Sequence, residues 1–116
     1  MTYAVSTSAQ AALQEHCSTE TEQIATALAG NPLIQQLKKT YLTPLEDYDA
    51  NNGTDYVDFI CNYLSCDGHI QNIANQMFIH RNTVHYKIHR VENLLGCSLQ
   101  RSDVKMYLLL ALTAQA

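Results

Sequence analysis

Residues 70–95 read IQNIANQMFIHRNTVHYKIHRVENLL, and this stretch decides the fold of the chain. Its first part places Ile70, Ile73, Ala74 and Met77 on one helical face. A second apolar series then recurs at steps of four, three and four: Val84, Ile88, Val91 and Leu95. Both series have the period of an α-helix, so the sequence predicts two helices joined by a tight turn.

The opposite face of the second predicted helix is polar. It carries flat or long hydrogen-bonding side chains: Asn82, His85, Tyr86, His89 and Asn93. A helix with an apolar inner face and such an outer face fits the major groove of DNA, where side chains can reach base edges. We therefore expect a helix-turn-helix whose second helix enters the groove.

The composition favours an all-α fold, a helical bundle around this unit. The chain has 116 residues, 47% of them hydrophobic, with two prolines and four glycines, and it lacks the alternating β-branched runs that predict strands. This length can form one domain with its own core. No apolar run approaches the roughly 20 residues that span a bilayer. The N-terminal residues do not show a basic region followed by an apolar one, so we do not expect export. We expect a cytoplasmic protein with no membrane partner.

The net charge of −4 is unevenly distributed. Residues 1–68 carry two lysines against nine acidic residues, a net charge of −7, whereas residues 69–116 carry five basic against two acidic residues, a net charge of +3. Four of the five histidines lie in the second segment. An acidic scaffold joined to a basic unit is expected when one face meets phosphates, although chance placement of a few charges is the alternative.

The four cysteines do not predict a disulfide framework or a metal site. Cys17, Cys61, Cys66 and Cys97 form no CxxC pair, so we expect reduced thiols. Cys61, Cys66 and His69 could be imagined as ligands, but a zinc site needs three or four converging groups, and isolated cysteines are usually small buried hydrophobes. We expect neither a metal nor a cofactor.

The N-terminal part, residues 1–30, is interpreted as an arm followed by a short helix. Residues 1–17 have little apolar periodicity and fit a weak helix or a mobile arm. Thr19 and Glu22 have the spacing of a capping box, and the short helix that follows ends at Gly30. We expect residues 31–116 to form a single compact unit containing the helix-turn-helix.

Local signals divide this unit into further helices. Asn31 is a suitable N-cap and Pro32 suits the first helical position. The buried side of that helix is predicted as Leu33, Ile34, Leu37 and Tyr41. Thr43 and Pro44 are expected to interrupt it, leaving one further turn before a loop at residues 51–53.

Two more helices flank the central pair. Thr54 is expected to cap the first, with Asp55 and Asp58 in its first turn, and its inner face is predicted as Val57, Ile60, Cys61 and Leu64. Gly96 is predicted to end the second helix of the pair in the left-handed conformation. A last helix, residues 102–114, is apolar around much of its circumference, so it is either enclosed in the core or covered by a partner chain.

The stretches YLTPLEDYD and FICNYLSCDGHIQNIANQMFIHRNTVHYKIHRVENLLGCSL, with the final Leu-rich helix, resemble the C-terminal DNA-binding domain of PucR-type transcriptional regulators. The helix-turn-helix also resembles that of the Fis nucleoid protein. The match rests on these residues: Tyr63, Leu64, Gly68, Ile73, Ala74, His80, Arg81, Asn82, Thr83, Tyr86, Arg90, Glu92 and Leu95. The similarity covers roughly residues 24–113. Because such domains usually follow a sensor domain, the resemblance implies an excised output domain or an unusually short relative.

The resemblance implies that residues 70–77 brace the DNA backbone while residues 81–95 enter the groove. The predicted DNA-binding residues are Arg81, Asn82, Thr83, His85, Tyr86, Lys87, His89 and Arg90. Among these, Arg81, Thr83, Lys87 and Arg90 are assigned to phosphates and the others to base edges. Asn82 and Thr83 have an alternative role as helix caps.

The chain departs from the family at three of these positions, where His85, Lys87 and His89 replace common arginines. Neutral histidine lacks the bidentate fork of arginine, so we expect altered specificity, and binding that is stronger near pH 6 than near pH 8. His69 and His80 are expected to cap or pack. Glu92 is expected to pair with a basic neighbour.

No catalytic motif is present: there is no GxSxG, no phosphate-binding glycine loop and no HExxH. We therefore predict that the chain is not an enzyme. The leading hypothesis is a bacterial transcriptional regulator's output domain that binds double-stranded DNA sequence-specifically as a homodimer. The alternative is a helical interaction or oligomerisation module without DNA binding, which the acidic majority of the chain would suit.

Overall fold

The fold is described from a computed structural model, which covers residues 19–113 except the side chains of residues 19, 21 and 25. The predictions for residues 1–17, for Ala114 and for the Thr19 side chain in its capping box lie outside the described part. The helices are α2 (Thr19–Leu28), α3 (Pro32–Leu37), η1 (Lys38–Leu42), α4 (Thr43–Asn52), α5 (Tyr56–Ser65), α6 (Ile70–Met77), α7 (Arg81–Leu95) and α8 (Ser102–Thr113). Residues 19–113 contain no strand, and the all-α prediction is confirmed.

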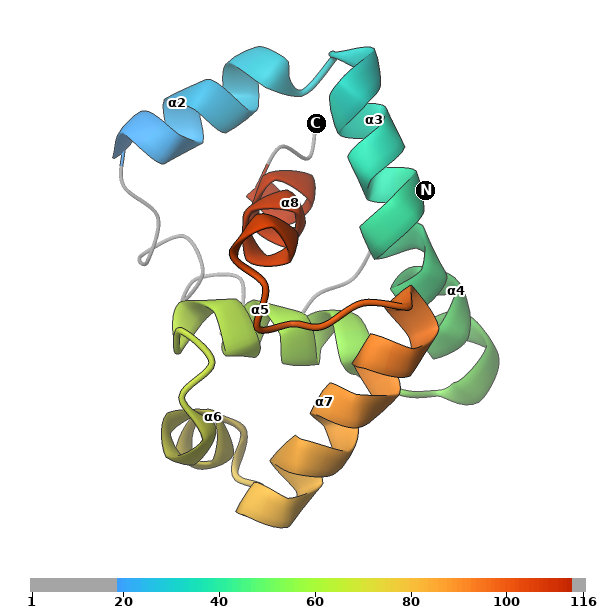
Figure 1. The fold of residues 1–116 in the computed structure, drawn as a ribbon, viewed down its shortest axis with the longest axis vertical. Coiled ribbons are helices and arrows are strands. Elements are labelled where there is room, and N and C mark those ends of the chain that lie inside the picture. The colour runs from blue at the N-terminus through green and yellow to red at the C-terminus, as the bar shows by residue number, and fades with distance from the viewer. Residues whose placement is uncertain (1–18, 114–116) are drawn as a thin grey trace.

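Helix α5 is the centre of the core. All its residues from Tyr56 to Leu64 are buried except Asp58, because neighbours cover it on several sides. Figure 1 shows α8 on one side of α5, with α6 and α7 on the other side. The predicted inner residues Val57, Ile60, Cys61 and Leu64 are all buried. Because α6 and α7 both rest on this helix, it fixes where the helix-turn-helix lies.

The predicted interruption at Thr43 and Pro44 is wrong. The helical path continues from α3 through η1 into α4, as Figure 1 shows. The π-helical segment η1 lies immediately before Pro44, and the Thr43 N–H donates to the carbonyl of Lys38, five residues earlier. This wider turn accommodates a residue that has no N–H and whose ring would clash with the preceding turn of an α-helix. Proline therefore changes the helix type here without ending the helix.

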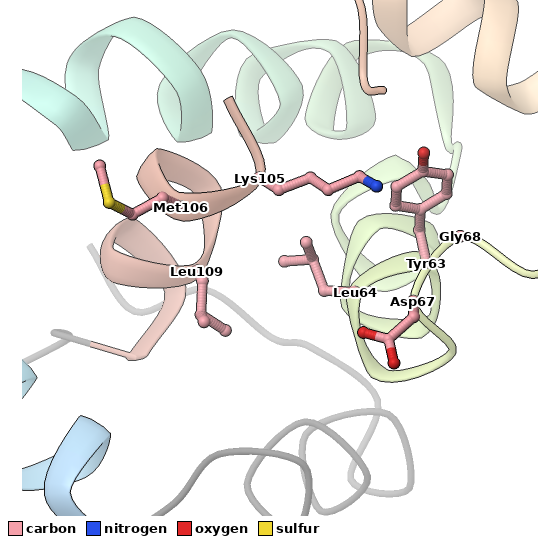
Figure 2. A pocket seen from close by; sticks show the side chains of 7 residues that line it. All are labelled: Tyr63, Leu64, Asp67, Gly68, Lys105, Met106 and Leu109. Carbon is pink, nitrogen blue, oxygen red and sulfur yellow. The ribbon is translucent and has the colours of Figure 1, made fainter. Parts of the chain in front are cut away.

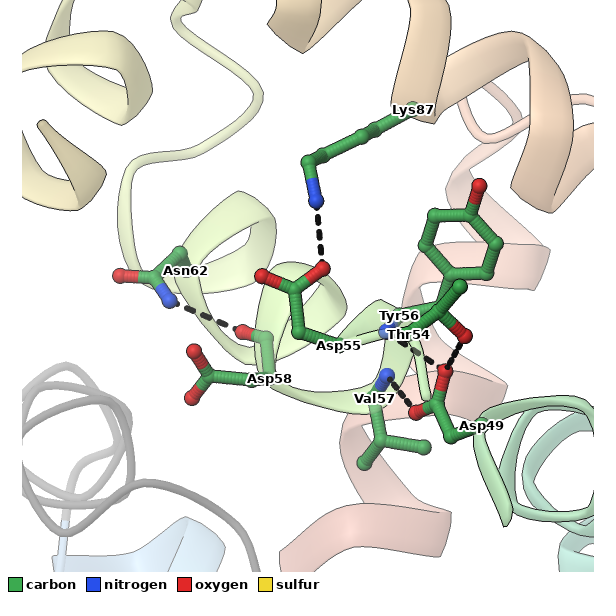
Figure 3. Close-up of polar contacts among 8 residues, drawn as sticks. All are labelled: Asp49, Thr54, Asp55, Tyr56, Val57, Asp58, Asn62 and Lys87. Carbon is green, nitrogen blue, oxygen red and sulfur yellow. Dashed lines mark hydrogen bonds and ion pairs between the residues drawn. The ribbon is translucent and has the colours of Figure 1, made fainter. Parts of the chain in front are cut away.

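The connection from α4 to α5 also differs from the prediction. Asn51 and Asn52 belong to α4, which ends at Gly53 in the left-handed conformation (φ 63°). Thr54 does not cap α5. Instead, the carboxylate of Asp49 accepts hydrogen bonds from the N–H groups of Tyr56 (2.9 Å) and Val57 (3.0 Å), as Figure 3 shows. A capping carboxylate supplied by the preceding helix stabilises the α5 terminus and fixes the corner between α4 and α5.

A second, smaller apolar cluster lies around Ile34, where Leu28, Leu37 and Leu110 pack against it. Asn31 caps α3 as predicted, accepting from the Leu33 N–H at 2.8 Å. Leu33 was predicted to be buried but is 74% exposed. The α3 face that meets α8 is the one bearing Ile34 and Leu37, and Leu33 lies outside it.

Helix α8 packs against α2, α3, η1 and α5. Val104, Leu108, Ala111 and Leu112 are buried, whereas Met106 is 51% exposed. Of the two expectations for this helix, enclosure in the core therefore describes most of its surface.

Candidate nucleic-acid interface

Helices α6 and α7 form the predicted pair and pack through the predicted residues. Ile73 and Ala74 of α6 and Val84 and Val91 of α7 are buried in one continuous core. Ile70, Met77, Ile88 and Leu95 are partly buried against it. Ala74 is a small residue in this core, and small side chains allow two helices to pack closely.

The turn between these helices depends on an unusual residue. Phe78 ends α6 in the left-handed conformation (φ 57°), and its N–H donates to the carbonyl of Ala74. The Ile79 N–H donates to the same carbonyl at 3.0 Å. Residues with a Cβ adopt this conformation at a cost, yet the Phe78 side chain is 93% exposed. The phenyl ring therefore gains little from packing within the described chain.

Histidines cap both helices of the pair. His69 Nδ1 accepts from the Asn72 N–H at 3.3 Å, and His80 Nδ1 accepts from the Asn82 N–H at 3.0 Å. The capping role expected for these histidines is confirmed. The cap of α7 is thus His80, and neither Asn82 nor Thr83 takes the alternative capping role. Asn82 is exposed.

The first part of α7 projects polar side chains into solvent. Arg81, Asn82 and His85 are exposed, Tyr86 is 60% exposed, and the His89 side chain is 76% exposed. Within residues 19–113, the side chains of Arg81, Asn82, His85 and Tyr86 make no hydrogen bond or ion pair. Thr83 is only partly exposed. The helical spacing in the sequence therefore correctly predicted which of these α7 side chains are exposed to solvent.

Two residues predicted to contact phosphates have partners inside the protein. Lys87 pairs with Asp55, a contact drawn in Figure 3, and its side chain is only 16% exposed. Arg90 donates to the Tyr48 hydroxyl at 2.7 Å, and this hydrogen bond raises the pKa of its guanidinium. Sequence reasoning missed Tyr48 and Asp55 because they lie 42 and 32 residues from their partners.

Glu92 fixes the end of α7. Its Oε2 accepts from the buried Leu99 N–H at 2.8 Å, while its Oε1 lies 3.8 Å from His89 Nδ1. The expected basic neighbour is thus His89, but the shorter contact is to the backbone. Gly96 ends the helix in the left-handed conformation (φ 71°), as predicted.

A polar network holds α6 on α5. Asn62, a buried polar residue, donates to the carbonyl of Asp58 at 2.9 Å and accepts from the Gln76 amide. Gln76 also donates to Ser65 and accepts from the Cys66 thiol. Burial of Asn62 requires such partners, so the network fixes the rotation of α6 about its axis.

A mostly apolar cavity of about 200 Å³ lies between α5 and α8, on residues that do not belong to α6 or α7. Figure 2 shows its lining: Tyr63, Leu64, Asp67, Gly68, Lys105, Met106 and Leu109. At Gly68 (φ 73°) a Cβ would lie 3.1 Å from the Tyr63 hydroxyl, so glycine is required there. The cavity has no converging set of reactive groups.

Among the described residues, Cys61, Cys66 and Cys97 are free cysteines, and burial disfavours the thiolate form of each. Burial, with the nearby Asp58 carboxylate, raises the pKa of Cys61 to about 12. Burial also raises the pKa of Cys66 and of Cys97. Within residues 19–113 no three His, Cys, Asp or Glu side chains gather that could hold a metal ion.

A helix capped and packed across a shorter one, with its polar start in solvent, defines a helix-turn-helix domain of the DNA-binding class. The chain belongs to the family of PucR C-terminal helix-turn-helix domains, whose family model matches residues 56–114. The resemblance inferred from the HRNT motif is therefore confirmed. Membership supports a DNA-binding regulatory output domain.

A curated relative agrees with this family. The purine catabolism regulatory protein of Bacillus subtilis (strain 168) is 33% identical over 84 residues. The match covers 71% of this chain and 16% of the relative. No solved structure matches the chain. No helix within residues 19–113 is long and apolar enough to cross a membrane.

Proposed function

We propose that the chain binds duplex DNA sequence-specifically by inserting the start of α7 into the major groove. The observation that carries this proposal is the row of exposed polar side chains on α7, combined with the buried packing of the same helix on α6. Asn82, His85, Tyr86 and His89 are the candidates for base contacts. Arg81 and the α7 N-terminus are the candidates for phosphate contacts.

The proposal extends to assembly and context. A homodimer would place two copies of α7 in major grooves about 34 Å apart. An upstream sensor domain, which the size of the relative makes reasonable, would control this output in a cytoplasmic regulator. Because the match covers only 16% of that relative, these statements concern a larger protein than the described residues.

The test is selection from random duplex oligonucleotides, followed by affinity measurements over a range of salt concentrations. Each phosphate contact contributes about −0.9 to the slope of log affinity against log salt. Arg81→Ala should weaken binding about tenfold or more and make the slope less negative by about 0.9. Arg101→Ala is the matched control, because it removes the same charge from a residue paired with Asp103 at the start of α8. Equal effects of the two variants would contradict the proposed interface.

A second candidate function is protein interaction without DNA binding. It is favoured by Ile24 and Leu33, which are 56% and 74% exposed on α2 and α3. Salt-independent binding to DNA, or none, would favour this alternative. Sedimentation of the chain over a range of concentrations would then show whether a second copy covers these side chains.

A further inference from the structure

Five residues connect the second half of α7 to the scaffold, and we call them the cation–aromatic clamp: Tyr48, Asp55, Tyr56, Lys87 and Arg90. The rings of Tyr48 and Tyr56 are stacked, with centroids 5.5 Å apart and an interplanar angle of 23°. Arg90 Cζ lies 5.5 Å from the centre of the Tyr48 ring, and Lys87 Nζ lies 5.6 Å from the centre of the Tyr56 ring. The clamp thus joins α7 to α4 and to the start of α5.

The spacing on α7 explains how both cations reach this stack. Lys87 and Arg90 are three residues apart, so they project from the same side of the helix. Each cation has a ring and a polar partner: Lys87 has Tyr56 and Asp55, and Arg90 has Tyr48 and its hydroxyl. A half-exposed ion pair alone would contribute little. Here the Lys87 side chain is 16% exposed and its ammonium group lies over the Tyr56 ring. The cation–π contact adds to the ion pair with Asp55 and helps to hold Lys87 in this position.

These contacts conflict with a role in binding phosphates. To reach a phosphate, Lys87 would have to give up both Asp55 and the Tyr56 ring, so the lost contacts would offset part of the gain. Arg90 would likewise have to leave the Tyr48 hydroxyl. Arg81 has no such partner among the described residues and remains available.

We propose that Lys87 and Arg90 are positioning residues, which act through Tyr48, Asp55 and Tyr56 to set the angle at which residues 81–86 meet DNA. This inference rests on the proposed function. A helix pinned at Lys87 and Arg90 presents its preceding turn in one orientation. A small rotation of α7 would displace every candidate base contact together.

The test exchanges the charges of one pair. Lys87→Asp should weaken DNA binding at least about tenfold, because it places two carboxylates together at the clamp. Adding Asp55→Lys should restore affinity to within about threefold of the wild type, with the wild-type salt slope. Asp55 suits this exchange because its side chain makes no capping hydrogen bond to α5. Asp55→Lys alone is the control for its own effect on folding.

A neutral variant provides a second readout. Lys87→Met keeps an unbranched apolar side chain against Tyr56 and removes the charge. Positioning predicts weaker binding with an unchanged salt slope, whereas a phosphate contact predicts a slope less negative by about 0.9. That slope change, or a charge exchange that stays as weak as Lys87→Asp, would overturn the proposal.

Failure of the proposed function would be visible separately. A wild-type chain without salt-dependent DNA binding would contradict that function itself. The clamp would then be tested by melting temperature: the charge exchange should recover the stability lost in Lys87→Asp, and no recovery would show that the pair does not hold α7.

Discussion

The two halves of α7 have the same amphipathic pattern but different surroundings. In the exposed half, residues 81–86, most outward side chains lie in solvent. In the anchored half, residues 87–95, Lys87, Arg90 and Glu92 contact α4, the start of α5 and the α7–α8 connection. A single helix can therefore be fixed at one end and available at the other. The comparison separates residues 81–86, which can recognise a ligand, from Lys87, Arg90 and Glu92, which orient them. His89 lies in the anchored half, but its side chain is exposed.

The largest expected change in stability is at Glu92, which anchors the second half of α7. Glu92→Ala should lower the free energy of unfolding by about 1–2 kcal/mol, because the buried Leu99 N–H would lose its charged acceptor. Urea denaturation measures the change. Asn93→Ala is the control on an exposed neighbour and should change stability by less than about 0.5 kcal/mol. If the two variants were equally destabilised, the end of α7 would not be anchored through Glu92.

Periodicity and capping signals predicted much of this fold because they depend on local physics. The α7 stripe, the left-handed Gly96 and the Asn31 cap all follow from interactions within a few residues. Pro44 was misread because its usual effect was compensated by a π-helical turn, a backbone adjustment that no residue type marks. The Asp49 cap was missed because a capping residue was sought directly before α5, and Asp49 lies seven residues before Tyr56.

In the candidate site, too, local sequence signals predicted exposure but not distant partners. Helical spacing correctly placed Arg81, Asn82, His85 and Tyr86 on the outer face. It could not assign partners to Lys87 and Arg90, since long side chains can bend toward the scaffold as easily as toward solvent. Their partners lie on other helices, so only the tertiary arrangement reveals them.

A smaller, stabilising effect is expected at the turn that leads into the exposed half. Phe78→Gly should raise the free energy of unfolding by about 0.5–1 kcal/mol, because glycine adopts φ 57° without steric cost. Phe78→Ala is the control, since it removes the exposed ring but retains the Cβ. Thermal or urea unfolding that shifted equally in both variants would locate the effect in the ring and not in the backbone. A gain in stability that occurs only with glycine would show that the backbone of the turn before α7 is strained at Phe78.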